Sequence, residues 1–137
     1  MEKIIVSGDL ESLDAISDYV TTVAKKANLD TTKTYKLRLA VDEIATNIVL
    51  HGYQEAKIKG DILCKAEFSD TSLKIYLEDS GMQYDATQQK KPEDLYKPLE
   101  ERSIGGLGIY LAINGVDKYI YERHGNSNYN IFIVNIK

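Results

Sequence analysis

The chain has 137 residues, 43% of them hydrophobic and 28% charged, with a formal net charge of −4 at pH 7. A chain of this length typically forms one domain that buries about two-thirds of its unfolded surface. The acidic balance argues against direct binding to nucleic acid, because phosphate affinity depends on clustered Lys and Arg. No segment approaches the roughly 18 apolar residues of a membrane span. Because residues 1–14 also lack the apolar core of a signal peptide, we expect a single cytoplasmic domain over 1–137 with no membrane partner.

The N-terminal half predicts one short strand followed by two helices. Residues 3–6 read KIIV, and the polar residues Ser7-Gly8-Asp9 then end the strand. Apolar residues at helical spacing predict an amphipathic helix over about 10–27. A second helix is expected from about Thr32 to His51, and Gly52 is well placed to end it. Its apolar positions form one core stripe of five residues: Leu37, Val41, Ile44, Ala45 and Ile48.

The C-terminal half predicts two hairpins separated by a polar segment and a short helix. Alternating residues at 61–68 and 72–79 indicate an antiparallel hairpin with one buried face, which would also bury Cys64. Strands follow at about 117–124 and 128–136, with a short helix at about 107–114 before them. Because strands and helices are grouped, we expect an α+β fold with a mixed or antiparallel sheet and helices on one face.

The polar segment from Gly81 to Gly106 is the longest stretch without a predicted element. Structureless segments of this length are uncommon in compact domains, and many of them act as lids over binding sites. The sequence therefore predicts a lid, with a disordered insertion as the alternative.

The first of three motifs is AVDEIATNIVLHGY at 40–53, in which Glu43 and Asn47 stand four residues apart and so share one helical face. An Asn oxygen can serve as one ligand of Mg²⁺ while phosphates and waters supply the others. The alternative for Asn47 is a side chain that only satisfies a backbone group. Glu43 could accept the proton of an attacking hydroxyl group or orient a water molecule. The alternative for Glu43 is a plain exposed acid.

The second motif is EDSGMQYD at 78–85, where an acid and a glycine follow an apolar strand. Asp79 shares its strand face with Leu73, Ile75 and Leu77, which points its carboxylate toward the buried side. A buried acid needs a partner, and the amino group of adenine is a suitable donor. Gly81 would let the chain turn close to the base. The alternative is an ordinary turn at the end of a strand.

The third motif is IGGLGIYLAI at 104–113, a glycine cluster at the start of an apolar helix. Free amides at a helix N-terminus attract phosphates, although the cluster matches neither common nucleotide-binding loop. A flexible hinge is the alternative. Arg102 either reaches the phosphates when the lid closes or is a surface arginine.

Together the three motifs resemble the GHKL ATPases, the Bergerat-fold superfamily. Within it, the His51-Gly52-Tyr53 ending and the run LEERSIGGLGIYL at 99–111 are most similar to the small anti-sigma factor serine/threonine protein kinases of bacteria. The resemblance implies a two-layer α/β sandwich that binds ATP and Mg²⁺ under a lid at about 82–106. Glu43 would be the general base and Asn47 the metal ligand. The implied nucleotide-binding residues are Asn47, Asp79, Gly81, Arg102, Gly105, Gly106, Leu107 and Gly108.

The resemblance also implies a function and partners. The chain would hold a sigma factor, would phosphorylate a Ser or Thr of an anti-anti-sigma protein with a STAS fold, and would form a homodimer. Met82 stands near the place where the family usually has a second glycine. This departure motivates an alternative function: a non-catalytic module that binds its partner by protein–protein contacts. In that case the nucleotide would act only as a conformational ligand, or no nucleotide would be bound. Simple ATP hydrolysis is a third possibility. Histidine kinases, topoisomerases and chaperones of this superfamily need additional domains, so we do not expect the chain to be one of these.

Overall fold

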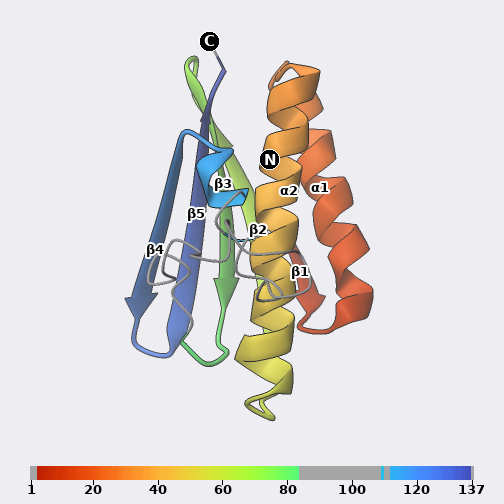
Figure 1. The fold of residues 1–137 in the computed structure, drawn as a ribbon, viewed down its shortest axis with the longest axis vertical. Helices are drawn as coiled ribbons and strands as arrows, with labels where there is room; N and C mark the ends of the chain where they lie inside the picture. The colour runs from red at the N-terminus through yellow and green to blue at the C-terminus, as the bar shows by residue number, and fades with distance from the viewer. Residues whose placement is uncertain (1–2, 84–108, 110–111, 137) are drawn as a thin grey trace, which may run out of the picture.

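The computed structural model describes residues 3–83, 109 and 112–136, in which two long helices pack on one face of a five-stranded sheet (Figure 1). Most of the predicted lid and most of the third motif lie outside these residues, including Arg102, Gly105, Gly106, Leu107 and Gly108. Of the predicted short helix, residues 109 and 112–114 are described and are helical. Within the described residues, no helix is long and apolar enough to cross a bilayer.

The five strands match the predicted strands to within one residue at each end. They run in the order β1-β2-β3-β5-β4, and every pairing among them is antiparallel, so the sheet has no mixed part within the described residues. Gly125 has a φ of 61° at the first position of the β4–β5 turn, as a type II′ hairpin requires. The strands are β1 (Ile4–Ser7), β2 (Asp61–Phe68), β3 (Ser72–Asp79), β4 (Lys118–His124) and β5 (Ser127–Asn135).

Two helical regions precede β2, as predicted. The first begins as a 3₁₀ turn, η1 (Leu10–Ser12), and continues as α1 (Leu13–Lys26). The second is α2 (Thr31–Asn47), whose first turn is capped by the side chain of Asp30, which accepts a hydrogen bond from the backbone N of Lys33 at 2.7 Å. α2 passes directly into a π-helical segment, η2 (Ile48–Gln54).

The prediction that Gly52 ends the second helix is wrong, because η2 continues through this residue to Gln54. The helix persists by widening to bonds between residues five apart, such as Glu55 N to Leu50 O and Ile58 N to Tyr53 O, each 2.9 Å. A glycine ends a helix by adopting a left-handed conformation. Here Lys57, with a φ of 57°, takes that conformation beyond the segment.

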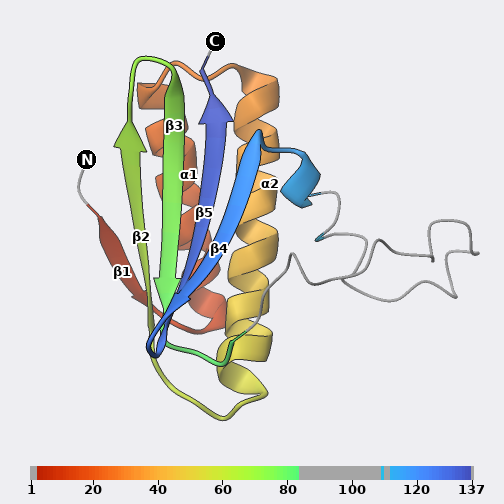
Figure 2. The same ribbon diagram turned by 90° about the vertical axis from the view of Figure 1, so that its left-hand side faces the viewer.

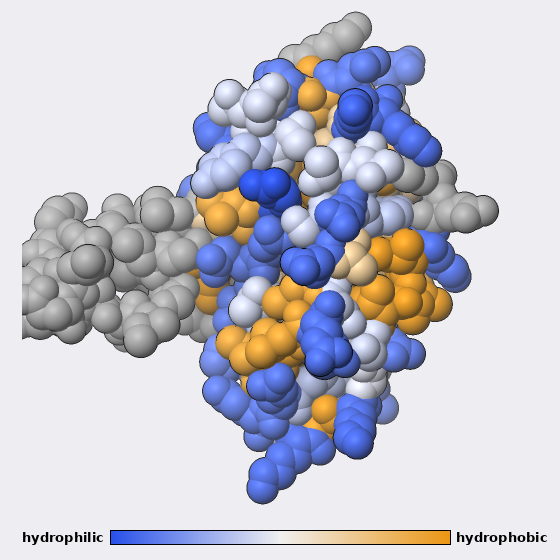
Figure 3. All heavy atoms as spheres, turned by 90° about the vertical axis from the view of Figure 1, so that its right-hand side faces the viewer, coloured by the Kyte–Doolittle hydropathy of each residue, from blue (hydrophilic) through white to orange (hydrophobic). Residues whose placement is uncertain are grey.

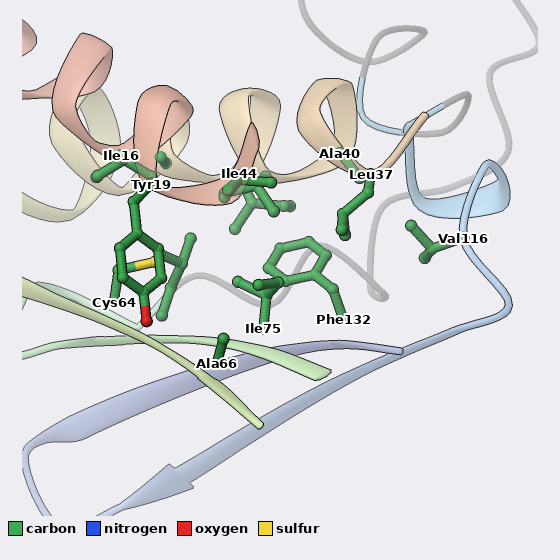
Figure 4. Packing of buried hydrophobic residues seen from close by; sticks show 14 of the residues in the cluster. Ile16, Tyr19, Leu37, Ala40, Ile44, Cys64, Ala66, Ile75, Val116 and Phe132 are labelled. Carbon is green, nitrogen blue, oxygen red and sulfur yellow. The ribbon is translucent and has the colours of Figure 1, made fainter. Parts of the chain in front are cut away.

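The core lies between the sheet and the two helices (Figure 4). All five residues of the predicted stripe, four on α2 and Ile48 on η2, are buried, and so is Cys64 on β2. The inward residues of β3 and β5, among them Ile75 and Phe132, face the helices. Figure 2 shows that the opposite face of the sheet is not covered by α1 or α2. The helix-covered face of the sheet therefore forms the core, and the first two motifs lie on this side.

The helix side of the surface is mostly hydrophilic, with apolar side chains in separate patches (Figure 3). The large apolar side chains that remain exposed include Ile5, Leu10 and Ile58.

Candidate functional site

Glu43 and Asn47 lie on one face of α2, as their spacing predicts. The side-chain Nδ2 of Asn47 donates a hydrogen bond to the backbone carbonyl of Glu43 at 2.8 Å. A carbonyl can only accept, so this bond fixes which end of the amide faces the helix. Asn47 is 8% exposed, and its Oδ1 accepts no hydrogen bond from the described residues. The one oxygen of this buried amide is therefore left for a ligand outside the described residues.

The Glu43 carboxylate is half-buried and has neither a hydrogen bond nor an ion pair within the described part of the chain. It thus lies one helical turn before Asn47 on the same face and remains available as a proton acceptor. The geometry permits the general-base role predicted for it.

The second motif is joined to the first through two glycines. The backbone N of Met82 donates to the carbonyl of Gly52 at 2.9 Å. Gly81 approaches so closely that a Cβ atom added to it would stand 2.7 Å from the Gly52 oxygen. π-helical turns occur often at functional sites, and here η2 presents Gly52 to the loop that follows β3. Glycine at position 81 is therefore required by the close approach of two backbones.

Asp79 ends β3 with its side chain on the buried face, as strand parity predicts, and is 4% exposed. Its Oδ1 accepts hydrogen bonds from the backbone N of Gly81 and from the Nδ2 of Asn128, both at 2.9 Å. Burial raises the pKa of Asp79, while these two bonds and the positive charge of Arg123 oppose the rise. The other oxygen, Oδ2, has no partner within the described residues and is free to accept from a ligand.

Asn128 on β5 holds Asp79 in place, and we did not identify it from the sequence. It is 2% exposed and pairs directly with Asp79 across the β3–β5 ladder. Its Nδ2 also donates to the Gly81 carbonyl at 3.0 Å. Its Oδ1 accepts from the Tyr121 hydroxyl at 2.5 Å and from Arg123 Nη1 at 2.8 Å. All the hydrogen-bonding capacity of this amide is therefore used within the protein.

A signal for Asn128 is present in the strand pattern. Positions 128, 130, 132 and 134 alternate onto one face, and the last two are the apolar residues Phe132 and Val134. Two asparagines on an otherwise apolar strand face indicate buried amides that need partners.

Tyr53, the last residue of the first motif, supports the Asp79 loop. Its hydroxyl donates to the Asp61 carbonyl at 2.6 Å and accepts from the backbone N of Ser80 at 2.9 Å. Gly8 and Gly60 pack against its ring, where added Cβ atoms would stand 2.4 Å and 2.8 Å from ring carbons. The tyrosine thus fixes the residue between Asp79 and Gly81.

A hollow of about 570 Å³ lies beside Tyr53 and includes none of Glu43, Asn47 and Asp79. It is formed by the end of β1 and the loop between η2 and β2, with a lining of Ser7, Gly8, Asp9, Tyr53, Gln54, Lys57, Ile58, Lys59 and Gly60. The candidate site is therefore separate from this hollow.

An antiparallel sheet backed by two helices, with a Glu–Asn pair on α2 and a buried acid at the end of β3, is the arrangement expected of a Bergerat-type ATP-binding domain. Residues 6–132 match the model of the family described as the histidine kinase-like ATPase domain. The match covers most of the chain, which therefore belongs to the histidine kinase-like ATPase domain family. The resemblance drawn from the three motifs is confirmed, and the family implies use of ATP.

Curated relatives lie in the branch indicated by the sequence. The chain is 31% identical over 91 residues to the serine-protein kinase RsbW of Bacillus subtilis strain 168, and the aligned residues make up 64% of this chain and 56% of that protein. It is 35% identical over 78 residues to RsbW of Bacillus thuringiensis strain Al Hakam, and there the aligned residues make up 55% of this chain and 48% of that protein. The chain thus spans about half the length of the curated relatives it matches.

Solved structures show the same fold at low sequence identity. The RsbU and RsbW domains of a Mycobacterium tuberculosis protein match with a TM-score of 0.66 and 13% identity, over 98% of this chain and 32% of that one. A blue-light activated histidine kinase of Erythrobacter litoralis EL346 matches with a TM-score of 0.58 and 16% identity, over 90% and 40%. The predicted α+β sandwich is therefore confirmed.

Proposed function

We propose that this chain is an ATP-dependent serine/threonine protein kinase that also acts as an anti-sigma factor. Its substrate would be a Ser or Thr of an anti-anti-sigma protein with a STAS fold, and it would work in the cytoplasm as a homodimer. The observation that carries the proposal is that Asn47 and Asp79 each keep one oxygen open while the rest of the side chain is held. Similarity to serine-protein kinases supports the choice of acceptor.

The residues fit a nucleotide with a divalent cation. Asp79 Oδ2 would accept a hydrogen bond from the adenine amino group, beside the tight turn at Gly81. Asn47 Oδ1 would hold Mg²⁺ together with the phosphates and waters. Among the described residues, no three His, Cys, Asp or Glu side chains gather to hold a metal, which suits an ion that takes most of its ligands from its substrate. Bound there, the ion would neutralise the charge of the phosphates.

Glu43 would accept the proton of the attacking hydroxyl group. As that oxygen bonds to the terminal phosphorus of ATP, the bond to the leaving ADP oxygen breaks. A carboxylate without a competing ion pair suits this task. The lid at 82–106 would cover the phosphates, with Arg102, Gly105, Gly106, Leu107 and Gly108 as contacts. These last assignments rest on sequence alone.

A second candidate function follows from Met82. It is 58% exposed, and its backbone N is tied to the Gly52 carbonyl at the start of the predicted lid. A side chain in place of the usual glycine favours a binding module that grips its partner without transferring phosphate. A partner affinity unaffected by ATP, ADP and Asn47→Ala, with no phosphorylated product, would support this candidate. Steady phosphate release without a protein acceptor would instead indicate an ATPase.

The experiment that tests the proposal is calorimetric titration of ATP and ADP, with and without Mg²⁺, on wild type and Asn47→Ala. Magnesium-dependent binding that the variant loses is expected. Phosphate transfer to a purified STAS-domain protein from the same organism would then be measured. A folded wild-type protein that binds neither nucleotide would remove the kinase and leave the binding module.

A further inference from the structure

Asn130 on β5 has an open donor that nothing in the described structure uses. The residue is 3% exposed and lies on the helix-facing side of the strand, two positions after Asn128. The Tyr119 hydroxyl donates to its Oδ1. Its Nδ2 has no hydrogen-bond partner in the part of the chain that the structure describes. Asn130 Nδ2 is not among the fully buried side-chain atoms without a partner, so this donor can be reached from outside the core.

The open donor of Asn130 lies near the open acceptor of Asp79. Asp79 pairs with Asn128 across the ladder, and Leu77 pairs with Asn130, so Asp79 and Asn130 are diagonal neighbours on one face. Such neighbours stand roughly 7–8 Å apart in antiparallel sheets. Side chains of residues at this separation can both reach one edge of a planar ring through hydrogen bonds of about 2.9 Å.

Both side chains are held in fixed orientations by the protein. Asn128 Nδ2 and the Gly81 amide occupy one oxygen of Asp79 and leave Oδ2 open. Tyr119 occupies the oxygen of Asn130 and leaves Nδ2 open. The result is one acceptor and one donor on the same inner face of adjacent strands.

We propose that Asn130 reads the base of the nucleotide. This inference rests on the proposed ATP-binding function and adds a specificity residue to it. Adenine presents an amino donor beside a ring nitrogen that accepts, so its amino group would meet Asp79 Oδ2 and the ring nitrogen would meet Asn130 Nδ2. Guanine presents a carbonyl oxygen where adenine has the amino group, and that oxygen would face the Asp79 carboxylate. A site built to pair polar groups rejects a base that leaves them unpaired.

The alternative is that Asn130 serves only to hold Tyr119. One oxygen suffices for that contact, and the substitution Asn130→Asp would keep such an oxygen while replacing the donor with an acceptor. The two explanations therefore differ in nucleotide preference rather than in fold.

The first test uses the wild-type protein and calorimetry with ATP, GTP, 1-deaza-ATP and 7-deaza-ATP. Each deaza analogue replaces one ring nitrogen on either side of the amino group with a C–H group. We expect ATP to bind more tightly than GTP and one of the two analogues to bind about tenfold more weakly than ATP. If both analogues bind as ATP does, the inference is overturned. If ATP itself does not bind, the proposed function fails instead.

The second test compares Asn130→Asp with Asn135→Asp, which adds the same charge at an exposed position of the same strand. Asn130→Asp should lower the ATP-to-GTP affinity ratio about tenfold or more, and Asn135→Asp should leave it unchanged. An unchanged ratio in a folded Asn130→Asp variant would contradict the inference. If that variant fails to fold, the deaza analogues on the wild type decide the question.

Discussion

Gly81 packs against the carbonyl of Gly52, and this contact joins the helical wall of the candidate site to the loop that carries Asp79. The two glycines differ in the space around them. An added Cβ on Gly81 would stand 2.7 Å from the Gly52 oxygen, whereas one on Gly52 would have its nearest neighbours at 3.8 Å. The contact therefore makes an asymmetric prediction about two substitutions of the same kind.

Gly81→Ala should lower the free energy of unfolding by about 1–3 kcal/mol, because the backbone must shift to admit a methyl group. It should also weaken ATP binding, since Gly81 N holds Asp79 Oδ1. Gly52→Ala is the matched control and should be neutral or stabilise by about 0.5–1 kcal/mol, as expected inside a helical segment. Urea unfolding and calorimetry measure both effects. If Gly81→Ala and Gly52→Ala lowered the free energy of unfolding equally, the close approach at Gly81 would not be the cause.

Asp79→Asn should abolish most ATP affinity without destabilising the protein at pH 7. Burial raises the pKa of Asp79 above its ordinary 3.8, so the folded state holds the proton to a higher pH than the unfolded state. The free energy of unfolding of the wild-type protein therefore falls as the pH rises from the unfolded-state pKa through the folded-state pKa of Asp79. It stays lower at neutral pH, where the buried carboxylate is charged. An asparagine can keep the acceptor oxygen for Gly81 and Asn128 without a buried charge.

The check on Asp79→Asn is urea unfolding at about pH 7 and about pH 3.5, with ATP titration at neutral pH. The variant should match or exceed wild-type stability at neutral pH, and any advantage should shrink at the acidic pH. A variant clearly less stable at neutral pH would mean that the charge of Arg123 outweighs the cost of burial.

Glu43→Gln should reduce phosphate transfer by about 10²–10⁴-fold while leaving ATP affinity within about twofold, because a general base acts in the transition state. Single-turnover transfer to a STAS-domain acceptor measures the rate. Asp42→Asn is the control, since neighbouring positions on a helix do not share a face. Transfer that survives in Glu43→Gln would show that another group takes the proton.

Tyr53→Phe should destabilise the protein by about 1–3 kcal/mol, because the Ser80 amide and the Asp61 carbonyl would lose their buried partner. Tyr35→Phe is the control, since Tyr35 is 56% exposed and should change stability by less than about 0.5 kcal/mol. Thermal and urea unfolding of both variants provide the measurement. Similar small effects in the two would argue against a structural role for the Tyr53 hydroxyl.

Cys64 should react with thiol reagents at about pH 8 only when the protein unfolds, because burial raises its pKa to about 12. Above the ordinary value of 9.0 the unfolded thiol ionises and the folded one does not, so stability should fall as the pH rises from about 9. Cys64→Ala removes this contribution, and its stability relative to wild type should improve by about 1.4 kcal/mol per pH unit in that range. Rapid labelling of the folded protein would contradict the assignment.

Much of the fold could be predicted because one face of each element is buried. Alternation at 61–68 and 72–79 predicted β2 and β3 with their correct bounds, since a strand with one buried face must alternate. The same parity placed Asp79 on the inner face. Helical spacing likewise predicted the shared face of Glu43 and Asn47, and α2 contains both residues four positions apart.

The prediction that Gly52 ends the second helix is wrong for a physical reason. A glycine after an apolar helix is a common stop, but it ends a helix only when it adopts the left-handed conformation. In this protein η2 continues through Gly52 with wider, π-helical turns, and the Gly52 carbonyl accepts a hydrogen bond from Met82 in the loop that follows β3. Local sequence contains no information about that distant loop.

The amino-acid sequence was sufficient to predict the order and type of the elements, the buried stripes, the family, and the residue types of two walls of the candidate site. These follow from local periodicity and from motifs that lie within single elements. Which polar atoms of the site remain without a partner depends on how the strands pair. Asn128 and Gly81 occupy one oxygen of Asp79, and Tyr119 occupies the oxygen of Asn130. The reason is that a hydrogen bond between strands depends on register and side-chain direction, which the pairing of β3, β5 and β4 sets.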